Sequence, residues 1–310
     1  MRTYPTYPKR KRSTALMTFM VSYALAFIVL AAAAFLAVAA LAPQSKAEPV
    51  RELSAYLPEQ TDERTLMLLF TDGSEPVGCT LLSLSAPRRE IPVTTLPPQT
   101  ELECGRKSLT VRELFCTGGV GRVEDACEQT FGITVDGYIL FDPESLREAA
   151  DIVGPVDLDM PFALEDPDGG PAAVAKGMQR INGRLLGEIV TFGEYPGRAE
   201  GRAALISELC TAYIRQYLPR AKGDVAERTF KAVAGCVKTD ISFKEVREFA
   251  DAMGFLAGEL GEPGGGRRVY TIEPEGEISG NGERFRLFEE SRRDIAALML
   301  SGREKAGRTG

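Results

Sequence analysis

The sequence predicts an α/β fold with a mixed central sheet covered by helices on both faces, preceded by one N-terminal transmembrane helix. Two observations lead to this prediction. From about residue 65 onwards, short apolar runs that end in Gly, Pro or Asp alternate with helical patterns. Before them, a basic cluster is followed by a long uncharged apolar run, which is typical of a membrane span.

The N-terminal apolar run predicts the topology of the chain. Four consecutive basic residues at 9–12 precede residues 15–42, which contain no Asp, Glu, Lys or Arg. A helix rises about 1.5 Å per residue, so this run exceeds the roughly 30 Å hydrocarbon core of a bilayer. Because Lys and Arg favour the cytoplasmic flank, we expect residues 1–14 to be cytoplasmic and everything after about residue 43 to be extracytoplasmic, at a cell membrane.

A cleaved secretory signal is the alternative to an anchor. Small residues at 37–39 (Ala-Val-Ala) and 45–47 (Ser-Lys-Ala) stand at cleavage-like spacing. The apolar region of such a signal usually has only about 7 to 15 residues, so we favour an uncleaved single-pass anchor. Both interpretations export the rest of the chain.

Charge and composition exclude several classes of function. The whole chain has a formal net charge of −7 and the first fourteen residues carry five basic groups, so residues 15–310 sum to −12. An acidic exported domain argues against a nucleic-acid partner. The chain has no histidine, which excludes Ser-His-Asp and Cys-His nucleophiles and histidine-containing zinc sites. Any general base must then be Asp, Glu, Lys, Tyr or the substrate itself.

The cysteines do not form a metal-binding pattern. None of the six shows CxxC spacing; they are Cys79, Cys104, Cys116, Cys127, Cys210 and Cys236. An even number outside the membrane permits disulfides in many pairings, and burial as small apolar side chains is the alternative.

Three strands are predicted at the start of the exported domain (65–300), after a juxtamembrane linker at 43–64. The apolar run Thr65–Phe70 ends before Asp72-Gly73, as a buried strand ends before a turn. Val77–Leu84 and Ile91–Leu96 are rich in Val, Ile, Thr and Leu. Turns that contain Gly and Pro separate the three runs, so we expect a meander.

Helical and strand patterns alternate after this meander. Glycines, an Asp-Pro pair and capping residues at 240 or 242 predict the helix ends. The predicted helices are Leu109–Thr117, Val123–Phe131, Pro143–Val153, Ile181–Val190 (leading into a strand), Gly201–Leu218, Phe243–Gly258 and Glu289–Leu300. The predicted strands are Tyr138–Phe141, Val156–Met160 and Val269–Ile272. We expect a loop at 166–170 and a disordered tail at 301–310.

Several stretches, taken in order, are similar to one family of envelope proteins. They are Leu66–Phe70, Thr80–Leu84, Thr95–Pro97, Gly118–Gly119, Phe131–Tyr138, Ile152–Pro161, Ile181–Gly183 and Lys238–Ser242. No single motif is specific, but the ordered series over about residues 65–280 resembles the LytR-CpsA-Psr family. The resemblance implies a single membrane helix and an extracytoplasmic α/β domain. It also implies transfer of glycopolymers from a polyprenyl-pyrophosphate carrier to peptidoglycan with a divalent metal.

The resemblance also implies site residues. A pyrophosphate site needs arginines to grip phosphate oxygens and carboxylates to hold Mg²⁺. An arginine-bearing segment of the family matches residues 195–202, which makes Arg198 and Arg202 the candidate catalytic residues. Asp72 ends the first strand, where ligands gather in open α/β sheets, and is the candidate metal ligand. The alternatives are a solvated helix face for the arginines and plain turn chemistry for Asp72.

Other positions of the family pattern are missing from this chain. Where the family has an Asp in the second strand, this chain has Cys79. The segment 95–100 lacks the family's Arg and Asp, and the segment 186–193 lacks both of its arginines. Each such contact typically contributes about 10²-fold or more to a rate, so we expect weak or no catalysis.

Three further patterns have simple structural explanations. Gly264–Gly266 lacks the ending of a phosphate-binding loop, so we interpret it as a flexible connector. Asp157 and Asp159 alternate with apolar residues, as on the wet face of an edge strand. Arg88-Arg89 belongs to a hairpin-like turn.

The sequence therefore predicts a membrane-anchored envelope protein that resembles LytR-CpsA-Psr phosphotransferases, with Mg²⁺ required only if it is active. The first alternative is a pseudoenzyme or scaffold that binds a lipid carrier or a partner in cell-wall assembly. The second is an unrelated anchored envelope domain. Expected partners are the membrane and a polyprenyl-phosphate-linked glycopolymer or peptidoglycan. A long apolar tunnel between sheet and helices would favour carrier binding, whereas a tunnel filled by Phe or Leu would indicate a scaffold.

Overall fold

A six-stranded mixed sheet forms the centre of the computed structural model, which describes residues 56–165, 173–220 and 224–299. In spatial order its strands are β10 (Val269–Thr271), β3 (Ile91–Leu96), β2 (Glu75–Ser85), β1 (Glu63–Asp72), β6 (Gly137–Phe141) and β9 (Lys238–Thr239). β1 to β3 pair antiparallel in chain order, which confirms the predicted meander. β6 runs parallel to β1, and β10 runs parallel to β3.

Several predictions fall on residues that the structure does not describe. The transmembrane helix at 15–42, the cytoplasmic segment at 1–14, the loop at 166–170 and the tail at 301–310 lie outside the described residues. Within the described ranges, every helix is too short or too polar to span a bilayer.

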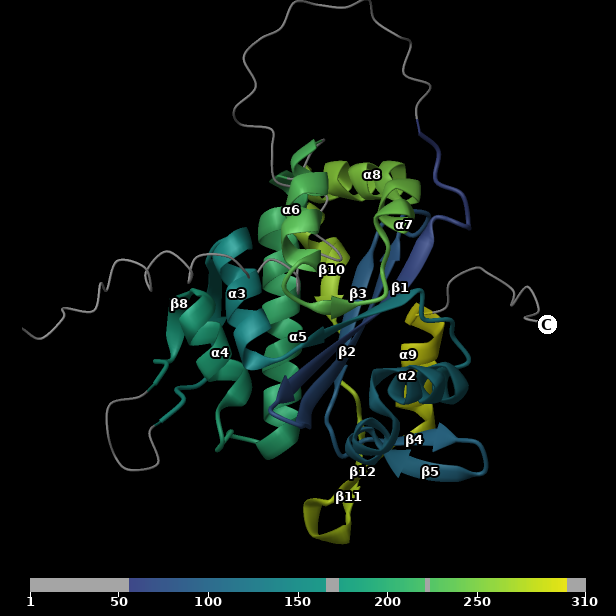
Figure 1. Cartoon of the computed structure of the whole chain (residues 1–310), viewed down its shortest axis with the longest axis vertical. Coiled ribbons are helices and arrows are strands. Elements are labelled where there is room, and N and C mark those ends of the chain that lie inside the picture. Colours follow the sequence, from purple (N-terminus) through teal and green to yellow (C-terminus); the bar gives the residue numbers. More distant parts are fainter. Residues whose placement is uncertain (1–55, 166–172, 221–223, 300–310) are drawn as a thin grey trace, which may run out of the picture.

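Helices cover both faces of the sheet, as predicted (Figure 1). One face packs against α3 (Pro143–Val153), α4 (Gly183–Thr191), α5 (Arg198–Tyr217), α6 (Asp224–Ala234), α7 (Phe243–Glu248) and α8 (Ala250–Gly261). The other face packs against α2 (Val111–Phe131) and α9 (Glu289–Met299). The fold is therefore a three-layer α/β arrangement.

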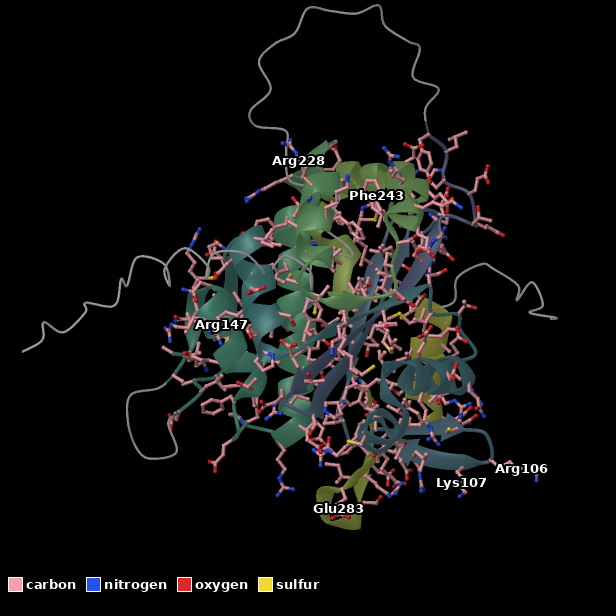
Figure 2. All side chains as sticks on the ribbon, viewed as in Figure 1. Arg106, Lys107, Arg147, Arg228, Phe243 and Glu283 are labelled. Atoms are coloured by element: carbon pink, nitrogen blue, oxygen red, sulfur yellow. The ribbon has the colours of Figure 1, made fainter. Side chains whose placement is uncertain are left out.

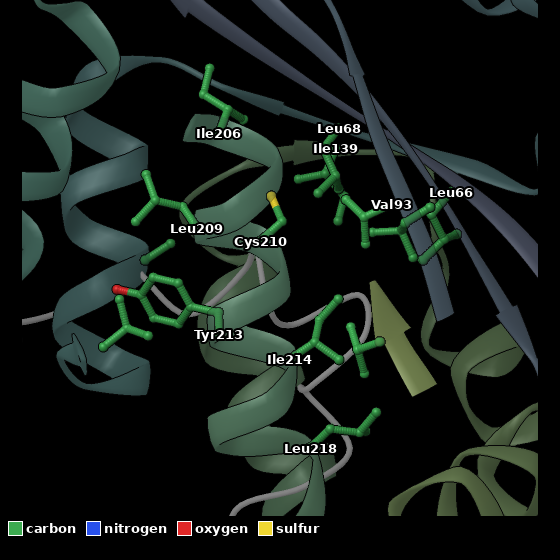
Figure 3. Close-up of a cluster of buried hydrophobic side chains, with 14 of the residues drawn as sticks. Leu66, Leu68, Val93, Ile139, Ile206, Leu209, Cys210, Tyr213, Ile214 and Leu218 are labelled. Carbon is green, nitrogen blue, oxygen red and sulfur yellow. The ribbon is translucent and has the colours of Figure 1, made fainter. Parts of the chain in front are cut away.

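The two faces of β1 explain its continuous apolar run. Leu68 and Phe70 belong to the core on the α5 side, whereas Met67 and Leu69 belong to the core on the α2 side. A strand that is buried on both faces does not alternate apolar and polar residues, so its sequence is a continuous apolar run. Figure 3 shows the larger core, where Cys210 and Ile214 of α5 point toward the sheet, and Leu209 and Tyr213 point toward the neighbouring helix.

Three small two-stranded sheets surround this frame. They are β4 (Glu101–Cys104) with β5 (Lys107–Thr110), β7 (Val156–Met160) with β8 (Gly177–Ile181), and β11 (Gly276–Ser279) with β12 (Arg284–Leu287). Of these six strands only β7 is predicted from the sequence. Asp157 and Asp159 lie on its exposed face, as expected, and Asp157 pairs with Arg180 at 3.5 Å.

Four predicted helices differ from the structure. The two helices expected over 109–131 form one element, α2, with a kink at Gly119, where φ is 69°. The helix predicted over 181–190 is present as α4, but it follows β8 and is succeeded by α5, so the strand expected after it is wrong. The helix expected over 243–258 is broken at Phe249, whose ψ of 5° does not continue the α7 helix.

Several predicted helix ends are confirmed by their caps. Asp142 caps α3, with Pro143 in its first turn, and Ser242 rather than Asp240 caps α7. Gly132 ends α2 in the left-handed conformation, φ 65°. The Gly264–Gly266 connector leads into a short 3-10 helix, η2 (Gly265–Arg268); two others are η1 (Leu218–Arg220) and η3 (Gly280–Gly282).

Candidate functional site: an arginine-lined cavity

A cavity of ≈ 330 Å³ opens at the end of the sheet where β1 and β3 finish. It lies between the loop after β3, the first turn of α2 and the η3–β12 segment. Its lining residues are Pro98, Gln99, Thr110, Arg112, Glu113, Gly282, Glu283 and Arg284. Glu283 marks this end of the molecule in Figure 2.

Backbone hydrogen bonds hold the walls of this cavity together. The N–H of Arg112 donates to the carbonyl of Pro98 at 2.9 Å, and the N–H of Phe285 donates to the carbonyl of Gln99 at 2.9 Å. Thr110 and Glu113 form a capping box that begins α2 at this point. The cavity walls are therefore part of the folded frame.

Arg198 reaches the cavity from the start of α5. A Cβ on Gly282 would lie 3.5 Å from Nη1 of Arg198, so the guanidinium lies against the backbone of η3. Arg198 is exposed and has a φ of 57°, directly after Gly197 with a φ of 75°. Left-handed backbone is unfavourable for a residue with a side chain, and such strain is found most often at functional sites.

Arg202 lies one helical turn further along α5 and is half-buried. Its guanidinium donates to the carbonyl of Phe192 and lies over the ring of Tyr195, 5.1 Å from the centroid. Its Nε is buried without a hydrogen-bond partner among the described residues. Burial lowers the pKa of Arg202. The carboxylate of Asp72 acts to raise this pKa and the guanidinium of Arg112 acts to lower it, which shows that Asp72 and Arg112 both lie close to Arg202.

Arg112 and Arg284 add two further positive charges. Nε of Arg112 lies 3.0 Å from Oε2 of Glu75, in a pair with both side chains more than half exposed. Arg284 bonds Glu101 at 2.9 Å and Glu113 at 3.0 Å. Burial acts to raise the pKa of Glu101, but the hydrogen bonds that Arg284 and Arg286 donate to its carboxylate outweigh burial and lower this pKa.

The carboxylates at this end of the sheet do not fit a Mg²⁺ site. Among the residues that the structure describes, no three Asp, Glu, Cys or His side chains are grouped as metal ligands. Asp72 is exposed at the end of β1, and Glu75, Glu101 and Glu113 are each bonded to an arginine. Glu283 is a further exposed carboxylate in the cavity lining. Mg²⁺ takes oxygen ligands in near-octahedral geometry, and two carboxylates that do not form a ligand group are a weak donor set for it.

Cys79, the position where the resemblance implies an acidic residue, lies away from the cavity. Its side chain is fully buried in the core between the sheet and α2. It contacts Cys127, and hydrogen bonding to Cys79 followed by burial raises the pKa of the Cys127 thiol. All six cysteines are free thiols in the structure, so the disulfide alternative is not realised.

Arg88 has a structural role in the β2–β3 turn. Its guanidinium donates to the carboxylate of Glu63 at 3.1 Å and to the carbonyl of Leu298 at 2.9 Å. It therefore fastens α9 to the edge of the sheet.

The structure brings the three sequence-predicted site residues to one end of the sheet. Arg202 and Asp72 are close enough for their charges to interact, and Arg198 borders the cavity. Sequence reasoning missed Arg112 and Arg284. Neither stands in a recognisable motif, and the only nearby signal is the Thr110–Glu113 capping box, which marks the helix start.

Comparison with known proteins identifies the domain. Residues 103–255 match the model of the LytR_cpsA_psr family. None of the curated proteins searched matches the sequence significantly.

Solved structures share the fold at low sequence identity. A proposed transcription regulator from Eubacterium siraeum DSM 15702 has a TM-score of 0.69 at 15% identity, covering 84% of this chain and 100% of that one. B. subtilis TagV has a TM-score of 0.62 at 15% identity, covering 77% and 96%. TagT, in a structure bound to LIIa-WTA, has a TM-score of 0.60 at 14% identity, covering 81% and 94%.

The matched segment and the shared fold define a LytR-CpsA-Psr-type α/β domain. The domain that contains residues 103–255 belongs to the LytR-CpsA-Psr family.

Proposed function

We propose that this protein binds the diphosphate of a polyprenyl-linked glycopolymer at the arginine-lined cavity. In this proposal it is anchored by residues 15–42, acts at the outer face of the cell membrane, and transfers the polymer weakly or not at all. Its setting is cell-wall assembly, with peptidoglycan as the acceptor if transfer occurs.

The observation that carries the proposal is the gathering of four arginines at this end of the sheet. Arg112 and Arg284 line the cavity, Arg198 borders it at Gly282, and Arg202 is close enough to Arg112 for their charges to interact. Guanidinium groups bind phosphate oxygens through paired, charge-assisted hydrogen bonds. Arg202 offers a buried Nε–H donor that has no hydrogen-bond partner among the described residues, and the exposed guanidinium of Arg198 borders the cavity. A diphosphate would supply acceptors to both.

The neighbouring structure with LIIa-WTA supports the choice of ligand class. That ligand is bound to TagT, whose fold this chain shares. The sequence departures at Cys79 and at residues 95–100 support weak or absent transfer, because these positions carry no charged group.

A pure scaffold is the second candidate, and the main core favours it. Leu68, Phe70, Phe141 and Tyr213 are at most 1% exposed between the sheet and the helices. A side chain without accessible surface adjoins no space as large as a water molecule, so a prenyl tail has no preformed room beside these residues. In the carrier-binding proposal, the tail therefore stays outside this part of the core.

The test uses the full-length chain in detergent with a polyprenyl diphosphate. Binding and phosphate release are followed together, with and without Mg²⁺. We expect binding that Arg198→Ala and Arg202→Ala each weaken by about tenfold or more, with little release. Arg106→Ala is the matched control, because Arg106 is an exposed arginine at the β4–β5 turn, remote from the cavity lining (Figure 2). No binding would favour the scaffold, and rapid release that depends on Arg198 would establish an active transferase.

A further inference from the structure

The carboxylates around the cavity do not form a group of metal ligands among the described residues. Glu75, Glu101 and Glu113 face arginines at 3.0 Å or less. Two exposed carboxylates remain at this end of the sheet: Asp72 lies near Arg202, and Glu283 lies in the cavity lining near Arg284. A bound diphosphate must still be neutralised, so this task falls to the guanidinium groups.

Arg112 is the arginine best placed to change partners. Its backbone is fixed by the hydrogen bond to Pro98 and by the capped start of α2, whereas its side chain is 54% exposed. Its side chain forms an ion pair with Glu75, whose side chain is 53% exposed. An exposed ion pair of this kind contributes little to stability, so Arg112 loses little free energy when it leaves Glu75 to contact a phosphate.

The other arginines lack this freedom. Arg284 is held by two carboxylates from different elements, Glu101 of β4 and Glu113 of α2. Arg202 is packed on Tyr195 and bonded to Phe192. These two side chains are therefore held in place by groups of the fold, whereas the exposed side chain of Arg112 is free to reorient.

We propose that Arg112 leaves Glu75 to bind the diphosphate, so that arginines neutralise the ligand and binding does not require a divalent cation. This inference rests on the proposed function and assigns Arg112 a binding role. Glu75 then acts as a competitor that keeps Arg112 paired while the cavity is empty of ligand.

The test measures binding of inorganic pyrophosphate to the full-length chain in detergent by calorimetry, in EDTA and in Mg²⁺. We expect equal or tighter binding in EDTA, because Mg²⁺ lowers the charge of free pyrophosphate. Arg112→Gln should weaken binding by about 10- to 100-fold, as loss of a charge-assisted contact does. Arg112→Lys should recover part of the affinity.

Glu75→Gln separates a binding role from a structural one. It releases Arg112, so the affinity for pyrophosphate should rise by about two- to fivefold, whereas a role in folding alone would leave the affinity unchanged or lower it. Arg106→Gln removes the same charge away from the cavity and should have little effect.

The outcomes distinguish the inference from the function on which it rests. Binding that requires Mg²⁺ and is unchanged in Arg112→Gln would overturn the role of Arg112 but leave the proposed function standing. Absence of pyrophosphate binding in both buffers would overturn both.

Discussion

Gly201 occupies the first turn of α5, between Arg198 and Arg202, where the structure leaves no room for a side chain. A Cβ at this position would lie 1.9 Å from the carbonyl oxygen of Pro196 and 3.0 Å from its carbonyl carbon. Both are backbone atoms, so a rotamer change cannot relieve the contact. Either α5 or the turn before it must move.

The Gly201→Ala substitution therefore sets two effects of opposite sign against each other. Helix propensity alone favours Ala over Gly by roughly 0.5–1 kcal/mol. Overpacking typically costs about 1–3 kcal/mol, and the rigid contact in this turn places the cost toward the upper end. We expect a net destabilisation of about 1–2 kcal/mol, which lowers Tm by roughly 2–8 °C in a domain of this size.

Gly254→Ala in α8 is the matched control. Gly254 is exposed, and nothing lies within 4 Å of its added Cβ. Only the propensity effect remains, so Tm should rise by about 1–3 °C. Thermal unfolding of the full-length chain in detergent measures both variants. A rise in Tm for Gly201→Ala, similar to that of Gly254→Ala, would refute the packing argument. Because Gly201 separates the two site arginines, its variant should also weaken pyrophosphate binding.

Three other predictions concern the core, the strained arginine and acid stability. Phe141→Ala should cost about 3–5 kcal/mol in urea unfolding, because its ring stacks on Phe70 at 5.4 Å in a filled core; a cost below 1 kcal/mol would contradict this. Arg198→Gly should raise stability by roughly 0.5–1 kcal/mol while weakening pyrophosphate binding, since its φ of 57° suits glycine. Because the pKa of Glu101 is lower in the folded state, its ionised carboxylate stabilises the fold at pH values above its ordinary pKa of 4.5. This contribution is lost as the pH falls through the pKa of the folded state. Glu101→Gln should therefore flatten the acid limb of a Tm–pH profile, and an unchanged limb would argue against the pairing with Arg284.

The central strands could be predicted because their burial leaves a local signal. Leu66 to Phe70 are apolar without interruption, and the following Asp-Gly marks the turn. The strands β4 and β11 gave no such signal. Each has only four residues: β4 (Glu101–Cys104) buries Leu102 alone, and β11 (Gly276–Ser279) buries none, so neither shows a run of apolar residues.

The break between α7 and α8 was not predictable from periodicity. The apolar spacing continues through Phe249, which is 6% exposed and has Arg64 over its ring at 5.0 Å. The helix breaks where Phe249 makes this contact with Arg64, and the residue at the break is neither Gly nor Pro.

The candidate site could be predicted only where its residues lie close in sequence. Arg198 and Arg202 stand four apart in one matched segment, so a resemblance can find both. Arg112 and Arg284 meet at the cavity from distant elements, α2 and β12. Their association depends on the packing of β12 beside β4, which no local pattern encodes.

The direction of β1 determines how far the cavity lies from the point where the described chain enters the domain. The strand begins at Glu63, near Tyr56, whose ring contacts Phe255 of α8, and it ends at Asp72 beside the cavity (Figure 1). Its ten residues, at about 3.3 Å each, span roughly 33 Å, comparable to the thickness of a bilayer's hydrocarbon core. If residues 15–42 hold the first end at the membrane, an upright domain carries its arginines that far above the lipid. The tilt of the domain, as much as the strength of its site, would then decide which carriers it can reach.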